Sequence, residues 1–214
     1  MERLASPPEG EPPVLAHTAP QVLPFDGMQW SNFEKLCYRL ARTEAEVVEA
    51  REYGASGQAD SGVDIYARLA DGSYVAYQCK HHKTLTPAKV RDAVEAFLTG
   101  LWADRARRFI LYTTASTTST RLAAEIEAQG QRLHERRQSV EFVVRGQAEL
   151  SAILKEHSDL VEDFFGARAA EEFVPGQARL SASSALEEIK DLLVQQQTSH
   201  QVVQLVFLDW QTPG

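Results

Sequence analysis

The stretch Gly62–Lys80, GVDIYARLADGSYVAYQCK, decides the fold of this chain. Residues 62–69 alternate between apolar and polar side chains, and residues 73–80 alternate again, which is the pattern of two half-buried strands. Between the two strands, Asp71-Gly72 is a strong signal for a tight turn. The stretch therefore predicts a β-hairpin.

The length of the hairpin loop decides which side chains face one another. Gln78 and Lys80 are two residues apart and share one face of the second strand, whereas Cys79 points to the opposite, apolar face. A loop of two residues would place Asp64 opposite Cys79. A loop of three residues, ending on Gly72 in the left-handed conformation, places Asp64 opposite Gln78 and diagonal to Lys80. A functional site on this hairpin requires the longer loop.

An aspartate, a glutamine and a lysine in this arrangement can hold a divalent metal beside a phosphodiester. A hard cation polarises the phosphate and lowers the pKa of a bound water. Asp64 would supply an anionic oxygen and Gln78 a neutral carbonyl oxygen. The ammonium of Lys80 would position the attacking water or stabilise the developing negative charge. An ordinary amphipathic hairpin, with Asp64 and Lys80 as a surface ion pair, would show the same pattern.

An amphipathic helix is expected upstream of the hairpin, over about residues 31–45. Its apolar positions have the i, i+3, i+4, i+7 spacing of a buried helix face: Phe33, Leu36, Cys37 and Leu40. Ser31 and Glu34 fit a capping box, and capping would explain Glu34 without catalysis. Glu34 is also the acidic candidate for a site on this helix.

Together these pieces resemble the PD-(D/E)xK restriction-endonuclease-like fold. The resemblance is carried, in order, by Glu34 on the helix, a Gly-rich approach at Gly54 and Gly57, GVDI at 62–65 and QCK at 78–80. Within that fold the chain is similar to Mrr-like nucleases, which carry Gln in place of the acidic residue before the Lys. The resemblance covers roughly residues 23–144. The continuation after Lys80, HHKTLTPAKVRDAV, resembles nuclease domains fused to or partnered with antiphage defence modules.

The resemblance implies an α/β fold, a restriction-endonuclease-like core with a central mixed β-sheet flanked by helices in the order α-β-β-β-α-β-α-β-α. The residue patterns favour the same order. Besides the first helix and the hairpin, we expect a strand over 46–53, a helix opening at Thr86-Pro87, a strand over 108–114, a helix over 119–137, a strand over 139–145 and a helix over 147–165.

Carried over by position, the resemblance implies four catalytic residues, Asp64, Gln78, Lys80 and Glu34, with Asp64 and Gln78 as ligands of Mg²⁺. Mn²⁺ is expected to substitute, and the substrate is expected to be double-stranded DNA. Basic groups beyond the hairpin are candidates for nucleic-acid binding: His81, His82, Lys83, Lys89 and Arg91. A solvated polar surface would explain the same residues.

Charge is distributed unevenly along the chain. The net charge is −8 over the 214 residues, but it is −5 over residues 1–60, +4 over 61–148 and −7 over 149–214. The basic excess coincides with the segment that carries the candidate site. This is the distribution that a binder of phosphate backbones needs, and the acidic ends would limit non-specific association.

Composition divides the chain into four parts. We expect a Pro-rich extended tail over 1–24, the nuclease domain over 25–166, a linker over 167–181, and a C-terminal helix and apolar segment over 182–214. The last part carries an apolar helical stripe and the apolar run QVVQLVFLDW, which favour self-association or a junction with a further module.

Several protein classes are disfavoured by the sequence. No apolar run is long enough to span a bilayer, and MERLASPPEG lacks the apolar core of a signal peptide. Cys37 and Cys79 fall on apolar faces without zinc-ligand spacing, so we expect them in the core of a cytoplasmic protein.

Two classes of function remain. The first is a metal-dependent DNA endonuclease, the effector of a bacterial antiphage defence or type IV restriction system, acting as a homo-oligomer with a sensor or NTPase module in the same system. The second is a non-cleaving nucleic-acid-binding or assembly module on the same fold. A housekeeping repair or junction nuclease is a further alternative.

Overall fold

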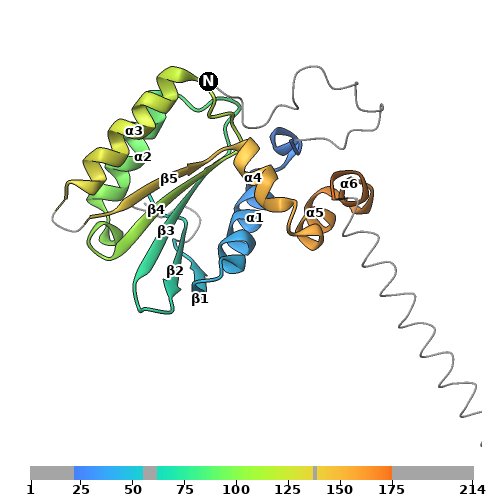
Figure 1. Ribbon diagram of the computed structural model, residues 1–214, viewed down its shortest axis with the longest axis horizontal. Helices are drawn as coiled ribbons and strands as arrows, with labels where there is room; N and C mark the ends of the chain where they lie inside the picture. The colour runs from blue at the N-terminus through green and yellow to red at the C-terminus, as the bar shows by residue number, and fades with distance from the viewer. Residues whose placement is uncertain (1–21, 55–61, 137–138, 175–214) are drawn as a thin grey trace, which may run out of the picture.

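The computed structural model describes residues 22–54, 62–136 and 139–174. The helices and strands follow the expected order (Figure 1): α1 Trp30–Thr43, β1 Val47–Glu52, β2 Ile65–Leu69, β3 Tyr74–Lys80, α2 Pro87–Thr99, β4 Ala106–Thr113, α3 Thr120–His134, β5 Glu141–Arg145, α4 Gln147–Leu154, α5 Ser158–Phe165 and α6 Ala167–Phe173. Short 3-10 helices, η1 Phe25–Gly27 and η2 Leu101–Asp104, precede α1 and β4.

The sheet is mixed, as predicted. Its five strands lie in the order β1-β2-β3-β4-β5, antiparallel from β1 to β3 and parallel from β3 to β5. Parallel neighbours need a crossover connection, and α2 and α3 supply the two crossovers. Both of these helices lie on the same face of the sheet, and α1 lies on the opposite face with α4, α5 and α6 beyond it (Figure 1).

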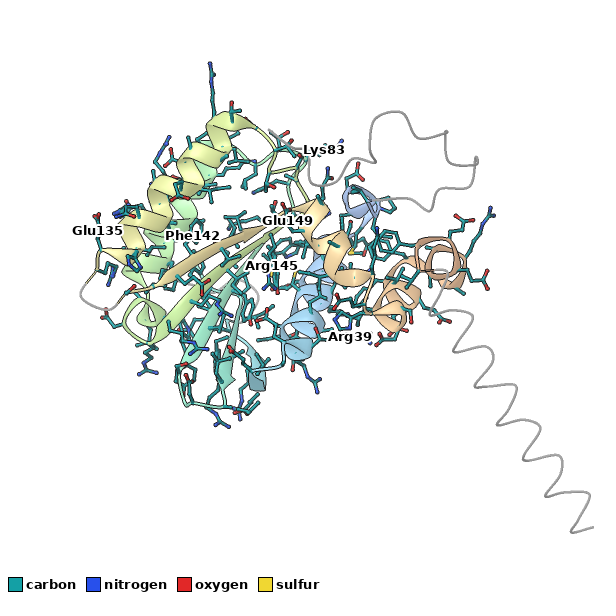
Figure 2. All side chains as sticks on the ribbon, in the orientation of Figure 1. Arg39, Lys83, Glu135, Phe142, Arg145 and Glu149 are labelled. Atoms are coloured by element: carbon teal, nitrogen blue, oxygen red, sulfur yellow. The ribbon has the colours of Figure 1, made fainter. Side chains whose placement is uncertain are left out.

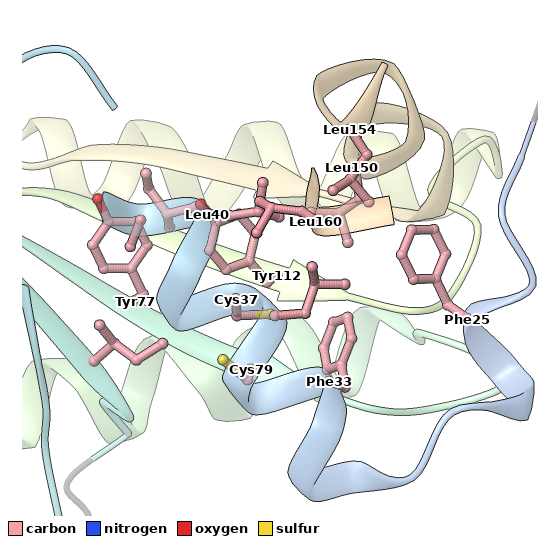
Figure 3. Close-up of a cluster of buried hydrophobic side chains, with 14 of the residues drawn as sticks. Phe25, Phe33, Cys37, Leu40, Tyr77, Cys79, Tyr112, Leu150, Leu154 and Leu160 are labelled. Carbon is pink, nitrogen blue, oxygen red and sulfur yellow. The ribbon is translucent and has the colours of Figure 1, made fainter. Parts of the chain in front are cut away.

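The larger core lies between the sheet and α1. The four apolar positions predicted for the face of this helix, Phe33, Leu36, Cys37 and Leu40, are all buried in it. Figure 3 shows Cys37 and Cys79 close together in this core, as expected from their apolar faces. Because Cys79 points toward α1, its neighbours Gln78 and Lys80 point toward the opposite side, where α2 lies.

The core on the α2 side is built around stacked aromatic rings. Phe97 of α2 stacks on Phe109 of β4 with ring centroids 4.3 Å apart. Trp102, in η2, stacks on Tyr66 at 4.3 Å. These contacts fix α2 over the β3–β4 pair and therefore fix its distance from the end of β3.

The helix α1 begins earlier than the capping box predicts. Gln29 is the N-cap, and its carbonyl accepts hydrogen bonds from the N–H groups of Asn32 and Phe33, each at 3.0 Å. Ser31 therefore lies inside the first turn, and the N-cap side chain makes no capping hydrogen bond. The predicted capping box with Ser31 as the N-cap is wrong for this reason.

Two predicted boundaries also differ from the structure. The helix predicted over 147–165 is two helices, because the chain turns at residues 155–157 between α4 and α5. Residues 167–173, predicted as the start of a linker, form α6, whose Ala170 and Phe173 are buried in the α1-side core. The composition of this stretch resembles a linker, but its two buried side chains supply enough apolar contact to hold a helical turn against α5.

The N-terminal tail predicted over residues 1–24 ends earlier in the chain than expected. Leu23 is buried, and its N–H donates to the Ser151 hydroxyl at 3.0 Å. Residues 1–21, the remainder of the predicted linker from 175 and the C-terminal segment 182–214 lie outside the described residues. Among the described helices, none is long and apolar enough to cross a membrane.

Candidate active site

The hairpin of β2 and β3 has the register that a functional site requires. Ile65 pairs with Tyr77, and the N–H of Leu69 donates to the carbonyl of Ser73 at 2.9 Å. The loop is therefore the three residues 70–72, and Gly72 has φ +84°. The prediction of a three-residue loop with a left-handed Gly72 is confirmed.

Asp64 lies where the two strands stop pairing. The register of the two strands ends with Ile65 opposite Tyr77, and the N–H of Asp64 donates to the carbonyl of that same Tyr77 at 2.8 Å, so the ladder becomes irregular at Asp64 and the predicted pairing of Asp64 with Gln78 is not part of it. A regular ladder would next join the N–H of Cys79 to the carbonyl of Val63. Instead, this N–H donates to Oδ2 of Asp64 at 2.6 Å, and the Asp64 side chain is buried, with 7% exposed. The carboxylate thus takes the place of a backbone acceptor and is held in one orientation beside the end of β3.

Gly62 fixes the approach to Asp64. Its φ is +69°, and a Cβ built on it would lie 2.7 Å from Cβ of Ala96 and 2.8 Å from the backbone nitrogen of Phe97. Only glycine allows both this backbone conformation and this close approach. The segment that leads into Asp64 is therefore packed directly against α2.

Gln78, near the end of β3, has an unusual environment. Its side chain is 4% exposed, and its Oε1 is buried without a hydrogen-bond donor among the described residues. Buried carbonyl oxygens are nearly always satisfied, and one that is not satisfied by the protein calls for a ligand, ion or water. Among the described residues, the oxygen predicted as a metal ligand thus lacks a hydrogen-bond partner, as do the buried hydroxyl of Tyr77 and the Nε1 of Trp102.

A pocket of ≈ 200 Å³ opens beside Gln78. It lies between the carboxyl-terminal end of β3 and α2, and it is lined by Gln78, Lys80, His82, Lys89, Asp92, Ala93 and Ala96. The small alanine side chains of α2 make room for the pocket. Its polar groups come from the end of β3, from His82 and from the first half of α2. Gln78 and Lys80 are therefore brought together, whereas Asp64 is not among the lining residues and meets this end of β3 through the N–H of Cys79.

The oxygen donors at this place fit a hard divalent cation. Asp64 offers a carboxylate and Gln78 an amide oxygen, the ligand types that Mg²⁺ prefers. Within the described residues there is no cluster of three or more His, Cys, Asp and Glu side chains that could hold a metal.

Glu34 approaches the site from the α1 side. Burial raises the pKa of the Cys79 thiol well above its ordinary value, the neighbouring Cys37 thiol raises it further, and the negative charges of Asp64 and Glu34 act in the same direction. Both carboxylates therefore lie near Cys79. Glu34 is partly exposed on the first turns of α1 and is not among the residues that line the pocket.

The two consecutive histidines point in opposite directions. The Nε2 of His81 lies 3.3 Å from the carbonyl oxygen of Phe25, and its ring lies 5.9 Å from that of Phe33, on the α1 side. His82 lines the pocket, and its carbonyl accepts a hydrogen bond from the Thr114 hydroxyl at 3.0 Å. Burial, followed by the charges of the nearby lysines, lowers the pKa of His82.

The remaining candidates for nucleic-acid binding also differ from one another. Lys83 is exposed in the loop that joins β3 to α2 (Figure 2). Lys89 lines the pocket, with its Nζ donating to the Thr84 carbonyl at 3.1 Å. Arg91 lies outside the pocket and forms an ion pair with Glu125.

The sequence reasoning did not single out Asp92 and Ala96, which both line the pocket. Asp92 is three positions after Lys89 on the helix, so a helical projection of α2 would have placed both on the same stripe. The packing of Gly62 against Ala96 left no local signal, because it joins segments far apart in the chain.

Comparison with known proteins agrees with this geometry. Residues 25–142, more than half of the chain, match the model of the Mrr_cat family, described as restriction endonuclease. The chain belongs to this family of restriction endonucleases, and so to a class of nucleases that hydrolyse DNA. The match contains the hairpin, the pocket and all four predicted catalytic residues. No curated protein matches the chain.

Proposed function

We propose that this protein is a Mg²⁺-dependent endonuclease that cleaves double-stranded DNA at the pocket between β3 and α2. The observation that carries the proposal is the Oε1 of Gln78, which is buried and lacks a donor among the described residues, on a residue that lines the same pocket as Lys80 and precedes Cys79, whose N–H holds the Asp64 carboxylate. Burying a carbonyl oxygen without a donor costs free energy, which a bound cation would offset.

Each residue of the site has a separate task in this proposal. Asp64 and Gln78 would hold the cation, which when bound polarises the scissile phosphate and lowers the pKa of a water. The hydrogen bond from the Cys79 N–H keeps the Asp64 carboxylate turned toward that position. Lys80 stabilises the negative charge that develops on the phosphate or orients the attacking water. Glu34 supports the site from α1 through its negative charge near Cys79.

The DNA backbone would lie along the pocket mouth. Lys89 and His82 line the pocket, and Lys83 is exposed next to it, so these three side chains are placed to contact phosphates. The environments of His81 and Arg91, which already contact Phe25 and Glu125, favour structural roles for those two. The +4 charge of residues 61–148 supports backbone binding by this part of the chain.

Beyond the chemistry, we infer a role as the effector nuclease of a bacterial antiphage defence or type IV restriction system in the cytoplasm. The sequence after Lys80 supports this role through its resemblance to nuclease domains linked to such modules. A sensor or NTPase module would then supply the trigger. Because Gln78 carries no charge, metal affinity without DNA is expected to be weak, which suits an enzyme that must stay inactive until recruited.

Digestion of a supercoiled plasmid tests the proposal. With Mg²⁺ or Mn²⁺ the full chain should convert the plasmid to nicked or linear forms, and EDTA should abolish the conversion. Conversion of closed circles requires internal cleavage, which distinguishes an endonuclease from an enzyme that needs ends. An intact plasmid under every metal condition, with the protein bound to it, would favour the non-cleaving alternative.

A further inference from the structure

We propose that Asp92 of α2 supplies a second carboxylate to the metal site, in the role that the uncharged Gln78 cannot fill. This inference rests on the proposed function, because it concerns the same cation. It adds a ligand from a helix that neither the hairpin motif nor the family match assigns to the site.

The first support is the position of Asp92 on its helix. Lys89, Asp92, Ala93 and Ala96 have the spacing i, i+3, i+4, i+7 and form one stripe along α2. All four line the pocket together with Gln78 and Lys80. The stripe is held close to the hairpin because Gly62 packs directly against Ala96. The Asp92 carboxylate therefore borders the same space as the Gln78 amide.

The second support is independent of Asp92. The Gln78 side chain is 4% exposed, borders the pocket and keeps its Oε1 without a donor among the described residues. An acceptor in this state indicates that something electropositive occupies the pocket when the protein works. A carboxylate on the facing wall is the group that such an occupant would attract.

The third support comes from the other charged residues of α2. Among the described residues, Arg91 is paired with Glu125 and Glu95 with Arg132, while the Nζ of Lys89 donates to the Thr84 carbonyl. Within the same described part of the chain, Asp92 forms no ion pair and no side-chain hydrogen bond, although Lys80 and Lys89 line the same pocket. Asp92 is thus the acid of α2 that no basic side chain among the described residues neutralises, and it lies exposed at the rim of the pocket.

The number of negative charges at the site also favours a role for Asp92. A site made of Asp64 and Gln78 alone offers one carboxylate to a divalent cation, which is the lower end of the one or two carboxylates that commonly hold Mg²⁺ in proteins. Asp92 brings the total to two and compensates for the glutamine on β3. Because it comes from the other wall of the pocket, it would hold the cation between β3 and α2.

Direct metal binding tests the inference without relying on cleavage. Mn²⁺ binding to the full chain, free of DNA, is followed by electron paramagnetic resonance for the wild type and for Asp92→Asn. We expect the substitution to weaken Mn²⁺ binding by at least about tenfold. The control is Glu95→Gln, which removes the same charge from the same helix outside the pocket and should change Mn²⁺ affinity much less.

A rescue variant sharpens the test. In the double variant Asp92→Asn/Gln78→Glu, the carboxylate on β3 should restore Mn²⁺ binding to at least the wild-type level. Restored binding supports the inference, and a double variant that binds as weakly as Asp92→Asn contradicts it.

The remaining outcomes separate the two proposals. If the wild type and Asp92→Asn bind Mn²⁺ equally, the inference fails while the proposed metal site stands. Tighter DNA binding by Asp92→Asn at unchanged Mn²⁺ affinity would identify Asp92 as a counter-charge to the lysines and would also overturn the inference. If the wild type binds no Mn²⁺ with or without DNA, both proposals fail.

Discussion

The carboxylate of Asp64 accepts a hydrogen bond from the backbone N–H of Cys79 at 2.6 Å, at the point where β2 and β3 stop pairing. A hydrogen bond to an ionised acceptor is stronger than one between neutral groups, and this one is buried. Asp64 therefore has a structural role besides its proposed chemical one, and substitutions at this position must be chosen to separate the two.

Two variants of Asp64 should lose activity but differ in stability. Asp64→Asn keeps an oxygen that accepts from the Cys79 N–H, so it should unfold close to the wild-type urea midpoint. Asp64→Ala leaves that buried N–H without an acceptor and should cost about 1–3 kcal/mol of the free energy of unfolding. We expect both variants to lose plasmid cleavage. Wild-type cleavage by Asp64→Asn would show that the carboxylate charge is not needed.

Glycine substitutions should show how closely α2 is tied to the hairpin. Gly62→Ala meets both a left-handed backbone and the atoms of Ala96 and Phe97, so we expect a loss of about 2–5 kcal/mol in unfolding free energy. Gly72→Ala meets only the left-handed backbone, because no atom lies within 4 Å of its Cβ, and should cost roughly 1–2 kcal/mol. Urea titration measures both values, and equal losses would argue against the close packing at Gly62.

The lowered pKa of His82 predicts a pH dependence of stability. In the folded protein, burial and then the charges of Lys89, Lys80 and His81 lower the pKa of this imidazole, whereas the unfolded chain takes up a proton near the ordinary pKa of 6.5. The unfolded state then binds more protons, so stability is full above about pH 6.5 and falls as the pH drops through the folded pKa. In urea titrations at pH 7.5 and 5.5, His82→Gln should lose less stability than the wild type. A His81→Gln variant with the same benefit would contradict the assignment to His82.

The C-terminal segment is predicted to control assembly. The stripe of Leu186, Ile189, Leu192 and Leu193 and the apolar run 201–210 lie outside the described residues, and they carry more apolar surface than a solvated tail. Two copies would place two active sites on opposite strands and turn nicking into double-strand cleavage. Light scattering should find an oligomer for the full chain and a monomer for a chain that ends at Gly176. A monomeric full chain, or an oligomeric truncation, would refute this prediction.

The sequence predicted the hairpin and its three-residue loop because the decisive information is local. Gly72 marks the left-handed loop position, and the two-residue period then places Gln78 and Lys80 on one face of β3 without knowledge of the rest of the chain. The mixed sheet followed from the order of short apolar runs and helical stripes for the same reason.

What the sequence did not predict depends on contacts between distant segments. The opposite directions of His81 and His82 are set by Phe25 and by Thr114, which belong to different layers of the fold. The helix start at Gln29 also differs by two residues from the capping signal at Ser31, a boundary that local patterns seldom fix.

The side chain that tests the account most directly is Lys80, because it is proposed to act in the chemical step, on the developing charge of the phosphate or on the attacking water. The measurement is the single-turnover rate of plasmid cleavage in Mg²⁺ by the wild type, by Lys80→Ala and by the control Arg105→Ala, which removes an exposed positive charge outside the pocket. The account predicts that Lys80→Ala cleaves at least about 100-fold more slowly while it remains folded and binds DNA, and that Arg105→Ala retains most of the rate. Cleavage by folded Lys80→Ala at the wild-type rate would contradict the active site proposed for this protein.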